Sequence, residues 1–240
     1  MIQRDVVINQ WFQRTAVKWL SSTIVMPKEE GMKLKVKWSG TLTSVQPRIR
    51  LMRSFDERSH TYLGYLLRII GEVEGVTREF IVAIGKGAQA KHDFRSGDRV
   101  TGVSEPVSDA RLEVAEFYKT SGLRLLERRS NETAEAPPWL GVVPDLETYR
   151  RRGHRRLASR TYDTKCPDCL WACRMPVEMI IDHWNPSRKK YRFETFCYGP
   201  KSCSFYSSGP TRKVPGRRGM TWEEEDWVDE EETAHRSMDE

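Results

Sequence analysis

Residues 165–203 read KCPDCLWACRMPVEMIIDHWNPSRKKYRFETFCYGPKSC and contain all five cysteines of the 240-residue chain. Cys166 and Cys169 form a CxxC pair, Cys173 follows them, and Cys197 and Cys203 close the stretch. A chain of this length can bury a hydrophobic core large enough to fold without disulfide bonds. Five clustered cysteines, an odd number, therefore favour a metal site over disulfides.

The residues between the two cysteine pairs predict a β-hairpin. Apolar and polar side chains alternate over residues 177–182 and 191–194, and NPSRK at 185–189 supplies a turn. A hairpin brings its two ends together, so cysteines at both ends converge, and zinc prefers four tetrahedral thiolate or imidazole ligands. We expect a zinc ribbon-like module over residues 161–210 that takes part of its folding free energy from the metal. The predicted Zn²⁺ ligands are Cys166, Cys169, Cys197 and Cys203.

Other ligand sets and other chemistries remain open at this stage. The second pair is separated by five residues instead of the common two, and Cys173 or His183 could replace one of the four ligands. An iron–sulfur cluster could use Cys166, Cys169, Cys173 and one later cysteine. A redox CPxC pair would need a thioredoxin-like βαβ context, which the sequence does not predict.

An HNH-type nuclease is the enzymatic alternative. Asp182 and His183 lie between the two cysteine pairs, as in zinc-stapled nucleases of that kind. The residues after Cys203, SFYSSGP, contain no His or Asn that would complete a catalytic metal site. The chain also lacks GxxxxGK[ST], GxSxG and HExxH motifs. We therefore expect a protein that is not an enzyme.

Charge is segregated along the chain. Residues 150–218 carry 17 basic and 5 acidic residues, a net charge of +12, whereas residues 219–240 carry −9. A basic segment is typical of a polyanion partner, because Lys and Arg contact phosphates and aromatic rings stack on unpaired bases. The alternative is that the aromatics form the small core of the ribbon and the charges only confer solubility. The predicted nucleic-acid-binding residues are Arg150, Arg151, Arg152, Arg155, Arg156, Arg188, Lys189, Lys190 and Arg192.

The remaining sequence predicts an α+β fold with a β-rich N-terminal domain. An amphipathic helix is expected over residues 5–20, strands over 32–38, 60–73, 78–85 and 95–107, and a short helix over 108–122. Strands separated by glycine-containing turns suggest a small barrel, of which an OB-like barrel is one form. Gly85-Lys86-Gly87 is interpreted as a strand bulge or turn.

Four segments follow from these patterns: an N-terminal domain (1–130), a linker with an Arg-rich segment (131–160), the ribbon-like module (161–210) and a basic-then-acidic tail (211–240). The tail is expected to be a disordered end, or else a docking motif anchored by Trp222 and Trp227 that could fold back on the basic region. Neither a transmembrane run nor a signal peptide is apparent, so we expect a cytoplasmic protein without a membrane partner.

The Cys166-Pro-Asp-Cys169 pair with Cys197 and Cys203, in a chain of this length without a nuclease signature, resembles the small zinc-motif large subunits of type IV CRISPR effector complexes. The resemblance covers the cysteine region and the overall size. It implies a non-catalytic role in a ribonucleoprotein used in antiviral defence, with RNA, DNA and other protein subunits as partners. Such a subunit would contact the 5′ end of the guide RNA and read the motif flanking the target DNA. The third class of function is a zinc-ribbon adaptor between proteins of transcription or replication.

Overall fold

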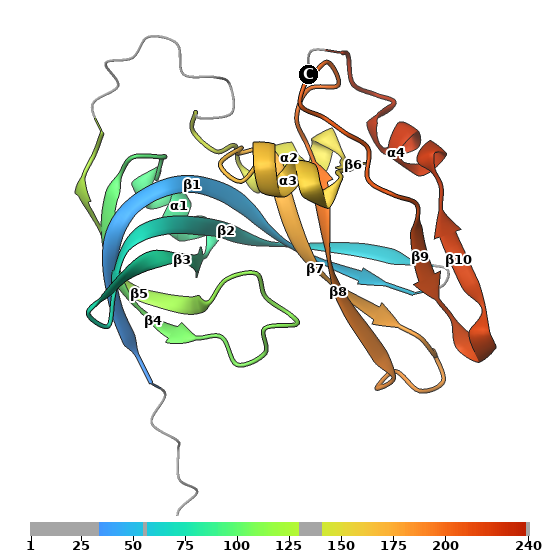
Figure 1. Ribbon diagram of the computed structural model, residues 1–240, viewed down its shortest axis with the longest axis horizontal. Coiled ribbons are helices and arrows are strands. Elements are labelled where there is room, and N and C mark those ends of the chain that lie inside the picture. The colour runs from blue at the N-terminus through green and yellow to red at the C-terminus, as the bar shows by residue number, and fades with distance from the viewer. Residues whose placement is uncertain (1–33, 55–56, 130–140, 239–240) are drawn as a thin grey trace, which may run out of the picture. The chain divides into compact units, whose positions relative to one another are not determined.

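The computed structural model describes residues 34–54, 57–129 and 141–238, and the helix predicted over residues 5–20 lies outside them. The described chain is rich in strands, as predicted, with short helices between them (Figure 1). From Lys33 onward it forms one compact unit. Within these ranges, no helix combines the length and the apolar character needed to cross a bilayer.

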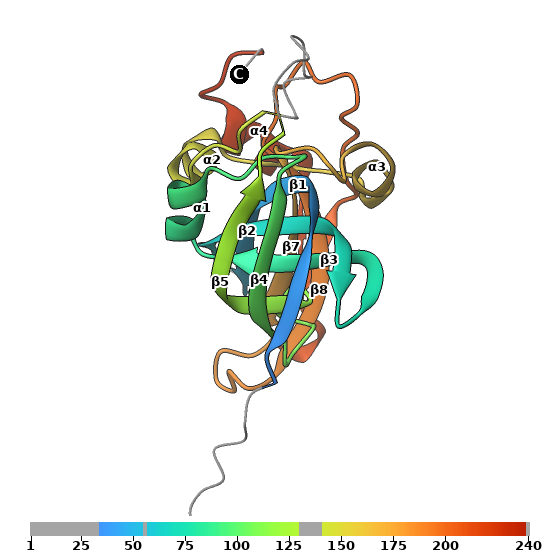
Figure 2. The same ribbon diagram turned by 90° about the vertical axis from the view of Figure 1, so that its left-hand side faces the viewer.

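Five strands close into a ring. They are β1 (Val36–Arg53), β2 (Arg58–Val73), β3 (Val76–Ile84), β4 (Arg99–Pro106) and β5 (Phe117–Glu127). The hydrogen-bonded order is β1–β2–β3–β5–β4, and β4 pairs back onto β1. Every pairing is antiparallel except β3–β5, which is parallel through Val82 and Phe117. α1 (Lys86–His92) connects β3 to β4 and lies beside the ring in Figure 2. The ring is a small barrel of the kind that the strand spacing suggested.

β1 is the longest strand, with 18 residues, and it takes part in three pairings. Its first part pairs with β4, most of its length pairs with β2, and residues 51–53 pair in parallel with β7. Register shifts fall between Leu42 and Ser44 and between Arg48 and Ile49. Such irregularities increase local twist and let one long strand curve around a barrel and still continue beyond it. The sequence predicted only the beginning of this strand.

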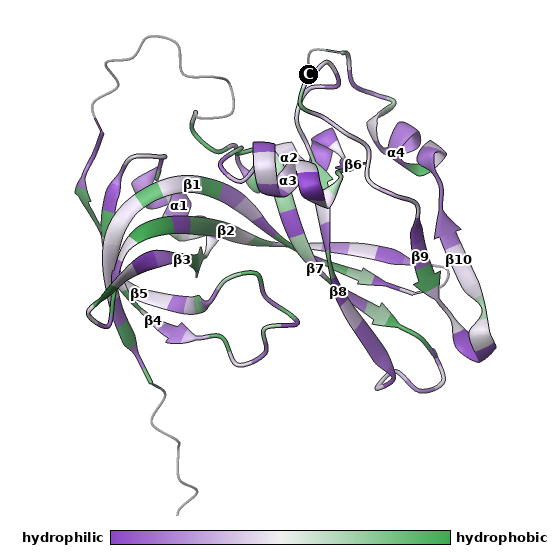
Figure 3. Cartoon of the chain, viewed as in Figure 1, coloured by the Kyte–Doolittle hydropathy of each residue, from purple (hydrophilic) through white to green (hydrophobic). Residues whose placement is uncertain are grey.

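Apolar side chains of opposing strands fill the interior of the ring. Trp38, Leu42 and Ile49 of β1 and Leu67 of β2 are each at most 1 % exposed and belong to one continuous core. The indole Nε1 of Trp38 donates a hydrogen bond to Ser104 Oγ at 2.8 Å, so the polar atom of this buried ring has a partner. Figure 3 shows hydrophobic and hydrophilic colouring in bands along β1 and β2, and each strand also contains a run of four buried residues.

The predicted hairpin is confirmed by the pairing of β7 (Ala172–Ile180) with β8 (Lys189–Cys197). Because β7 also pairs with β1, the hairpin continues the sheet of the ring, and β6 (Arg155–Arg156) adds a further edge beside β8. The expected linker and Arg-rich segment contains α2 (Leu146–Arg152), and α3 (Ser159–Lys165) leads into the first cysteine pair. Residues 130–140 of that expected linker lie outside the described chain.

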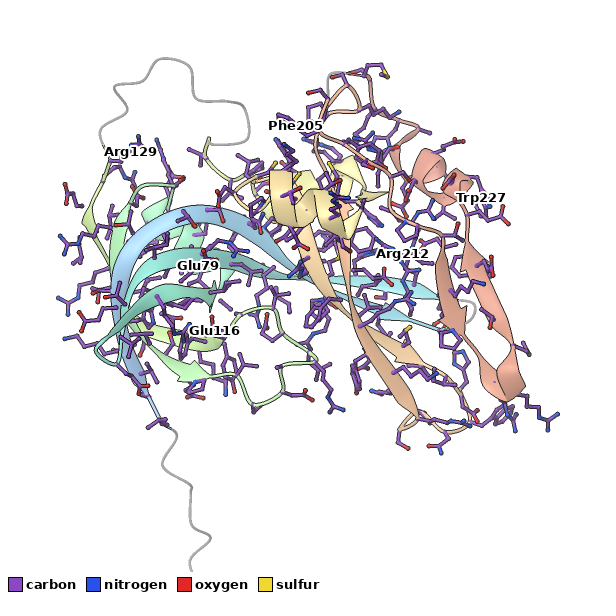
Figure 4. All side chains as sticks on the ribbon, in the orientation of Figure 1. Glu79, Glu116, Arg129, Phe205, Arg212 and Trp227 are labelled. Atoms are coloured by element: carbon purple, nitrogen blue, oxygen red, sulfur yellow. The ribbon has the colours of Figure 1, made fainter. Side chains whose placement is uncertain are left out.

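The expectation of a disordered C-terminal tail is wrong for the described residues. The chain forms β9 (Arg212–Pro215), a short 3₁₀ turn η1 (Arg217–Gly219), β10 (Thr221–Glu224) and α4 (Asp226–Thr233). The acidic residues fold back on the basic region, which was the second hypothesis for the tail. Arg156 Nε donates to Asp229 Oδ2 at 3.0 Å, and Lys213 Nζ lies 2.9 Å from Glu223 Oε1. Figure 4 shows the Arg212 side chain beside β9 in the interior and Trp227 at the periphery of α4.

The short helix predicted over residues 108–122 is also wrong. Residues 108–116 form turns, and residues from Phe117 onward form β5. Alternate side chains of the segment pack against β3 and β4, and this tertiary pairing overrides the local helical pattern. A helix does form earlier in the chain: α1 (Lys86–His92) occupies the segment that had been interpreted as a bulge or turn.

Candidate metal centre and nucleic-acid interface

Four of the five cysteines line one pocket. Cys166 and Cys169 come from the turn between α3 and β7, Cys197 ends β8, and Cys203 lies in the loop that follows. The pocket has a volume of about 270 Å³ and is completed by apolar and aromatic side chains that include Trp171. These four are the predicted ligands, so the structure brings the predicted set to one place at the open end of the hairpin.

Tight turns hold the thiols at this pocket. The amide of Cys169 donates to the carbonyl of Cys166 at 3.2 Å, and the amide of Cys203 donates to the carbonyl of Pro200 at 3.2 Å. The amide of Gly199 donates to Cys197 Sγ at 3.4 Å. An N–H that points at sulfur stabilises negative charge on it, as thiolate ligands of a metal require.

Cys173 does not belong to this group. Its side chain is fully buried on β7 within the core of the ring, where Sγ donates to the carbonyl of Pro47 at 3.3 Å. Burial raises the pKa of this thiol, so it remains protonated. The iron–sulfur hypothesis, which needed Cys173 among the ligands, therefore has no support in the geometry.

The donor set fits a thiophilic cation in kind. Burial, reinforced by neighbouring thiols, raises the pKa of Cys166 to about 11 and, despite amide hydrogen bonds, that of Cys169 to about 12. All five cysteines are free thiols. Binding of zinc would displace these protons, because coordinated sulfur is the thiolate. Nevertheless, nowhere in the described ranges do three or more His, Cys, Asp or Glu side chains reach the spacing of metal ligands. The four thiols therefore line one pocket, but their sulfur atoms are not close enough together to coordinate a single ion.

Gln46 of β1 anchors the first cysteine pair to the ring, a role that sequence patterns did not predict. Its buried Nε2 donates to the carbonyls of Cys169 at 2.9 Å, Pro167 at 3.1 Å and Cys166 at 3.3 Å. Its Oε1 accepts a hydrogen bond from the hydroxyl of Tyr162 at 2.8 Å. The only available signal was a glutamine placed inside an apolar strand, where an amide needs dedicated partners.

Three of the predicted nucleic-acid-binding arginines stack on aromatic rings. Their guanidinium carbons lie 3.8–4.8 Å from the ring centres, which is the range of cation–π contacts. The pairs are Arg150 with Tyr62, Arg152 with Trp171, and Arg155 with Tyr206. Arg151 is exposed at the end of α2. Arg152 and Arg155 stack beside the cysteine pocket, but their guanidinium groups also donate to the carbonyls of Tyr198 at 2.7 Å and Pro200 at 2.9 Å.

Arg156 has to be removed from the predicted interface. Its side chain is 0 % exposed and binds Asp229, Asp226 and the carbonyl of Glu224, so it cannot meet a phosphate. Lys189 and Arg192 are partly engaged, by Glu178 at 2.7 Å and by Glu194 at 2.6 Å respectively. The acidic C-terminal segment therefore neutralises Arg156, and acids of the hairpin itself pair with Lys189 and Arg192.

The tip of the β7–β8 hairpin projects aromatic and basic groups into solvent. Trp184 is 84 % exposed, and His183, Arg188 and Lys190 around it are exposed as well. Asp182 is engaged locally, because its Oδ1 accepts the amide of Trp184 at 3.0 Å and its Oδ2 lies 3.6 Å from Arg217 Nε. Figure 3 shows hydrophilic colouring over much of β8 toward this tip.

No family model, curated protein or solved structure matches this chain. The function is therefore argued from the strand ring, the cysteine pocket and the exposed cations alone.

Proposed function

We propose that the chain is a non-catalytic nucleic-acid-binding protein with a structural zinc ion. The observation that carries the proposal is the hairpin tip, where an indole that is 84 % exposed stands among exposed basic side chains. A tryptophan left in water contributes nothing to the fold, and an indole surrounded by cations is suited to stack on a base while the cations contact phosphates. Trp184, Arg188 and Lys190 are the residues proposed for this contact.

The strand order of the ring supports the same class of ligand. A five-stranded ring in the order β1–β2–β3–β5–β4, with a helix between β3 and β4, is the connectivity of OB-type barrels. Barrels of this type commonly bind single-stranded nucleic acid, using aromatic rings and a basic groove. Strand order supports this ligand class by analogy with other barrels. Trp184, Arg188 and Lys190 at the hairpin tip supply the chemical groups that would bind it.

Zinc would be held by Cys166, Cys169, Cys197 and Cys203. When bound, it would supply a cross-link between the start of β7 and the end of β8 and would lock both turns. Gln46 would act as an outer support, because it fixes the carbonyls of the first turn from β1. In this proposal the metal stabilises the base of the hairpin and takes no part in a reaction.

The proposed biological setting is a type IV CRISPR ribonucleoprotein. The chain would be its large subunit, contacting the 5′ end of the guide RNA and reading the motif that flanks the target DNA. Its partners would be RNA, DNA and the other protein subunits. Support comes from the resemblance of the cysteine region together with the exposed cations on α2 and at the hairpin tip.

Fluorescence anisotropy on the full chain tests the tip. Trp184→Ala should weaken binding of a labelled oligonucleotide about fivefold or more, because stacking contributes about 1–3 kcal/mol per base. Arg188→Gln/Lys190→Gln should weaken binding and reduce its salt dependence. The matched control is Lys35→Gln/Lys37→Gln, which removes the same charge from exposed positions near the start of β1. Equal affinities for all variants would refute the role of the tip.

Co-expression with the neighbouring genes tests the setting. A short RNA of defined sequence should copurify with the chain and with other protein subunits, and the metal content should be zinc. Copurification of a protein without any nucleic acid would instead support the adaptor hypothesis. Iron in place of zinc would refute the assignment of the cysteine pocket.

A further inference from the structure

A second candidate surface lies on the ring, away from the cysteines. A groove of about 690 Å³ runs between the β3–α1 junction and the first half of β5. Its walls come from residues 83–92 and 118–123, and Arg48 of β1 completes it. The groove contains the Gly85-Lys86-Gly87 segment, to which the proposed function assigns no role.

The groove is basic. Arg48, Lys91, His92 and Lys119 line it, and none of its lining residues within the described chain is acidic. Acids outside the groove pair with two of these cations: Glu113 binds Arg48 through two nitrogens, and Glu105 lies 3.3 Å from Nζ of the half-exposed Lys119. The ring of Tyr118 forms part of the same wall and lies 4.7 Å from Lys119 Nζ. A cationic groove with an aromatic ring is complementary to a strand of nucleic acid.

One glycine of the groove, Gly87, has no explanation in packing or backbone conformation, whereas Gly85 is the N-cap of α1, a position that accepts glycine. A Cβ atom added at Gly85 or Gly87 would meet no atom within 4 Å, so neither position is small because of packing. Neither residue has a positive φ angle, so the backbone conformation does not require glycine either. Gly87 even lies inside α1, where glycine is unfavourable relative to alanine. A glycine pair that leaves its space open lets the backbone of a ligand approach closely.

We infer that this groove binds the phosphodiester backbone of single-stranded nucleic acid, with Lys91 and Lys119 at the phosphates and Gly85 and Gly87 as its floor. A concave groove lets one strand lie along it, whereas a duplex is read by elements that project into its grooves. The inference rests on the proposed nucleic-acid role but concerns a surface separate from the tip. It gives the chain two contacts, one on the ring and one on the hairpin.

The test compares three variants of the full chain by anisotropy with a fluorescein-labelled oligouridine and its oligothymidine equivalent. Lys91→Gln/Lys119→Gln should weaken binding about tenfold or more and should flatten the plot of log affinity against log salt by about 1.4, since each single-strand phosphate contact contributes about 0.7. Gly87→Gln should weaken binding by filling the floor, while the Tm stays unchanged or rises because glutamine is the better helix former. Lys35→Gln/Lys37→Gln should change neither affinity nor salt slope.

The outcomes separate this inference from the proposed function. If groove variants bind normally while the hairpin-tip variants lose affinity, the inference is overturned and the proposed function stands. If Gly87→Gln lowers the Tm, another part of this chain fills the groove, which also overturns the inference. If the unaltered chain binds neither oligonucleotide even at low salt, both fail, and an acidic protein partner becomes the better occupant. A stronger effect with oligouridine would identify RNA as the strand, and equal effects would indicate backbone recognition alone.

Discussion

Arg53 Nη1 on β1 lies 2.5 Å from Glu224 Oε2 on β10, and both side chains are only 1 % exposed. Arg53 also contacts Glu194 of β8 at 3.2 Å, and Glu224 also contacts Arg58 of β2 at 2.6 Å. The C-terminal segment is thus attached to the ring and to the hairpin through one buried charge network. Burying these charges costs desolvation free energy. Removing one member destabilises the fold further, because it leaves a buried charge without its partner.

Glu224→Gln should destabilise the protein strongly. The substitution keeps the shape but leaves Arg53 with a buried positive charge that has lost a partner, which costs about 3 kcal/mol. Urea unfolding measures the free energy. The adjacent Glu223→Gln is the matched control, since its partner Lys213 is 69 % exposed and the pair should contribute less than about 1 kcal/mol. Equal effects of the two substitutions would contradict a structural role of the network.

Cysteine substitutions should divide into two groups. Cys166→Ala and Cys203→Ala should abolish stoichiometric zinc and lower the Tm, because each removes a ligand of a metal that stabilises the fold. Cys173→Ala should retain zinc and cost only about 1 kcal/mol, the usual effect of a buried deletion of this size. Metal analysis and thermal unfolding check both. Zinc that survives Cys203→Ala but is lost with Cys173→Ala would overturn the ligand set.

Stability should fall as the pH falls from about 6.5 to about 4. Burial, with Arg58 and Arg53 nearby and Glu224 opposing them, lowers the pKa of His60 to about 4. Burial and the nearby His60, Arg58, Arg212 and Arg53 lower the pKa of His154 well below its usual range. Both rings are therefore neutral in the folded protein, with their centres 4.7 Å apart.

The unfolded chain binds these protons below about pH 6.5, so their contribution is present above that pH and is lost on acidification. Between pH 7 and pH 5 the His60 contribution should amount to about 1–2 kcal/mol. Urea unfolding at the two pH values measures it, and His60→Gln should reduce the difference. An unchanged difference in that variant would show that other groups cause the acid sensitivity.

A purified preparation should not cleave labelled DNA or RNA in Mg²⁺ or Mn²⁺. Asp182 is occupied by the amide of Trp184 and by Arg217, and His183 is exposed beside it. His183→Ala should therefore leave zinc content and the Tm unchanged. Metal-dependent cleavage that His183→Ala abolishes would establish the nuclease alternative instead.

Local sequence patterns predicted many of the strands and the hairpin, but not the pairing of β3 with β5 that closes the ring. Alternation along residues 60–73 and 177–182 is enough to predict strands, because each buries one face. The β3–β5 contact rests on one bridge, Val82 to Phe117, and nothing in either segment reveals a partner so distant in sequence.

The C-terminal segment was missed for a related reason. Its acidic residues form a run that is typical of a solvated segment. Glu224 and Asp229 are nevertheless buried, because Arg53 of β1 and Arg156 of β6 pair with them. The four-cysteine pocket was predictable because the cysteines flank one hairpin. Gln46, which supports the pocket, was not predictable, because it acts from another strand.

The continuity of β1 has a mechanical consequence. One unbroken strand runs from the ring into the sheet of the hairpin, through its pairings with β2, β4 and β7. Because the ring and the hairpin share this strand, the strands beside the basic groove and those of the hairpin belong to one eight-stranded sheet. If one nucleic acid contacts both the basic groove and the hairpin tip, as proposed, the distance between these two surfaces sets the length of its protected footprint. We then expect the same footprint length for different bound sequences.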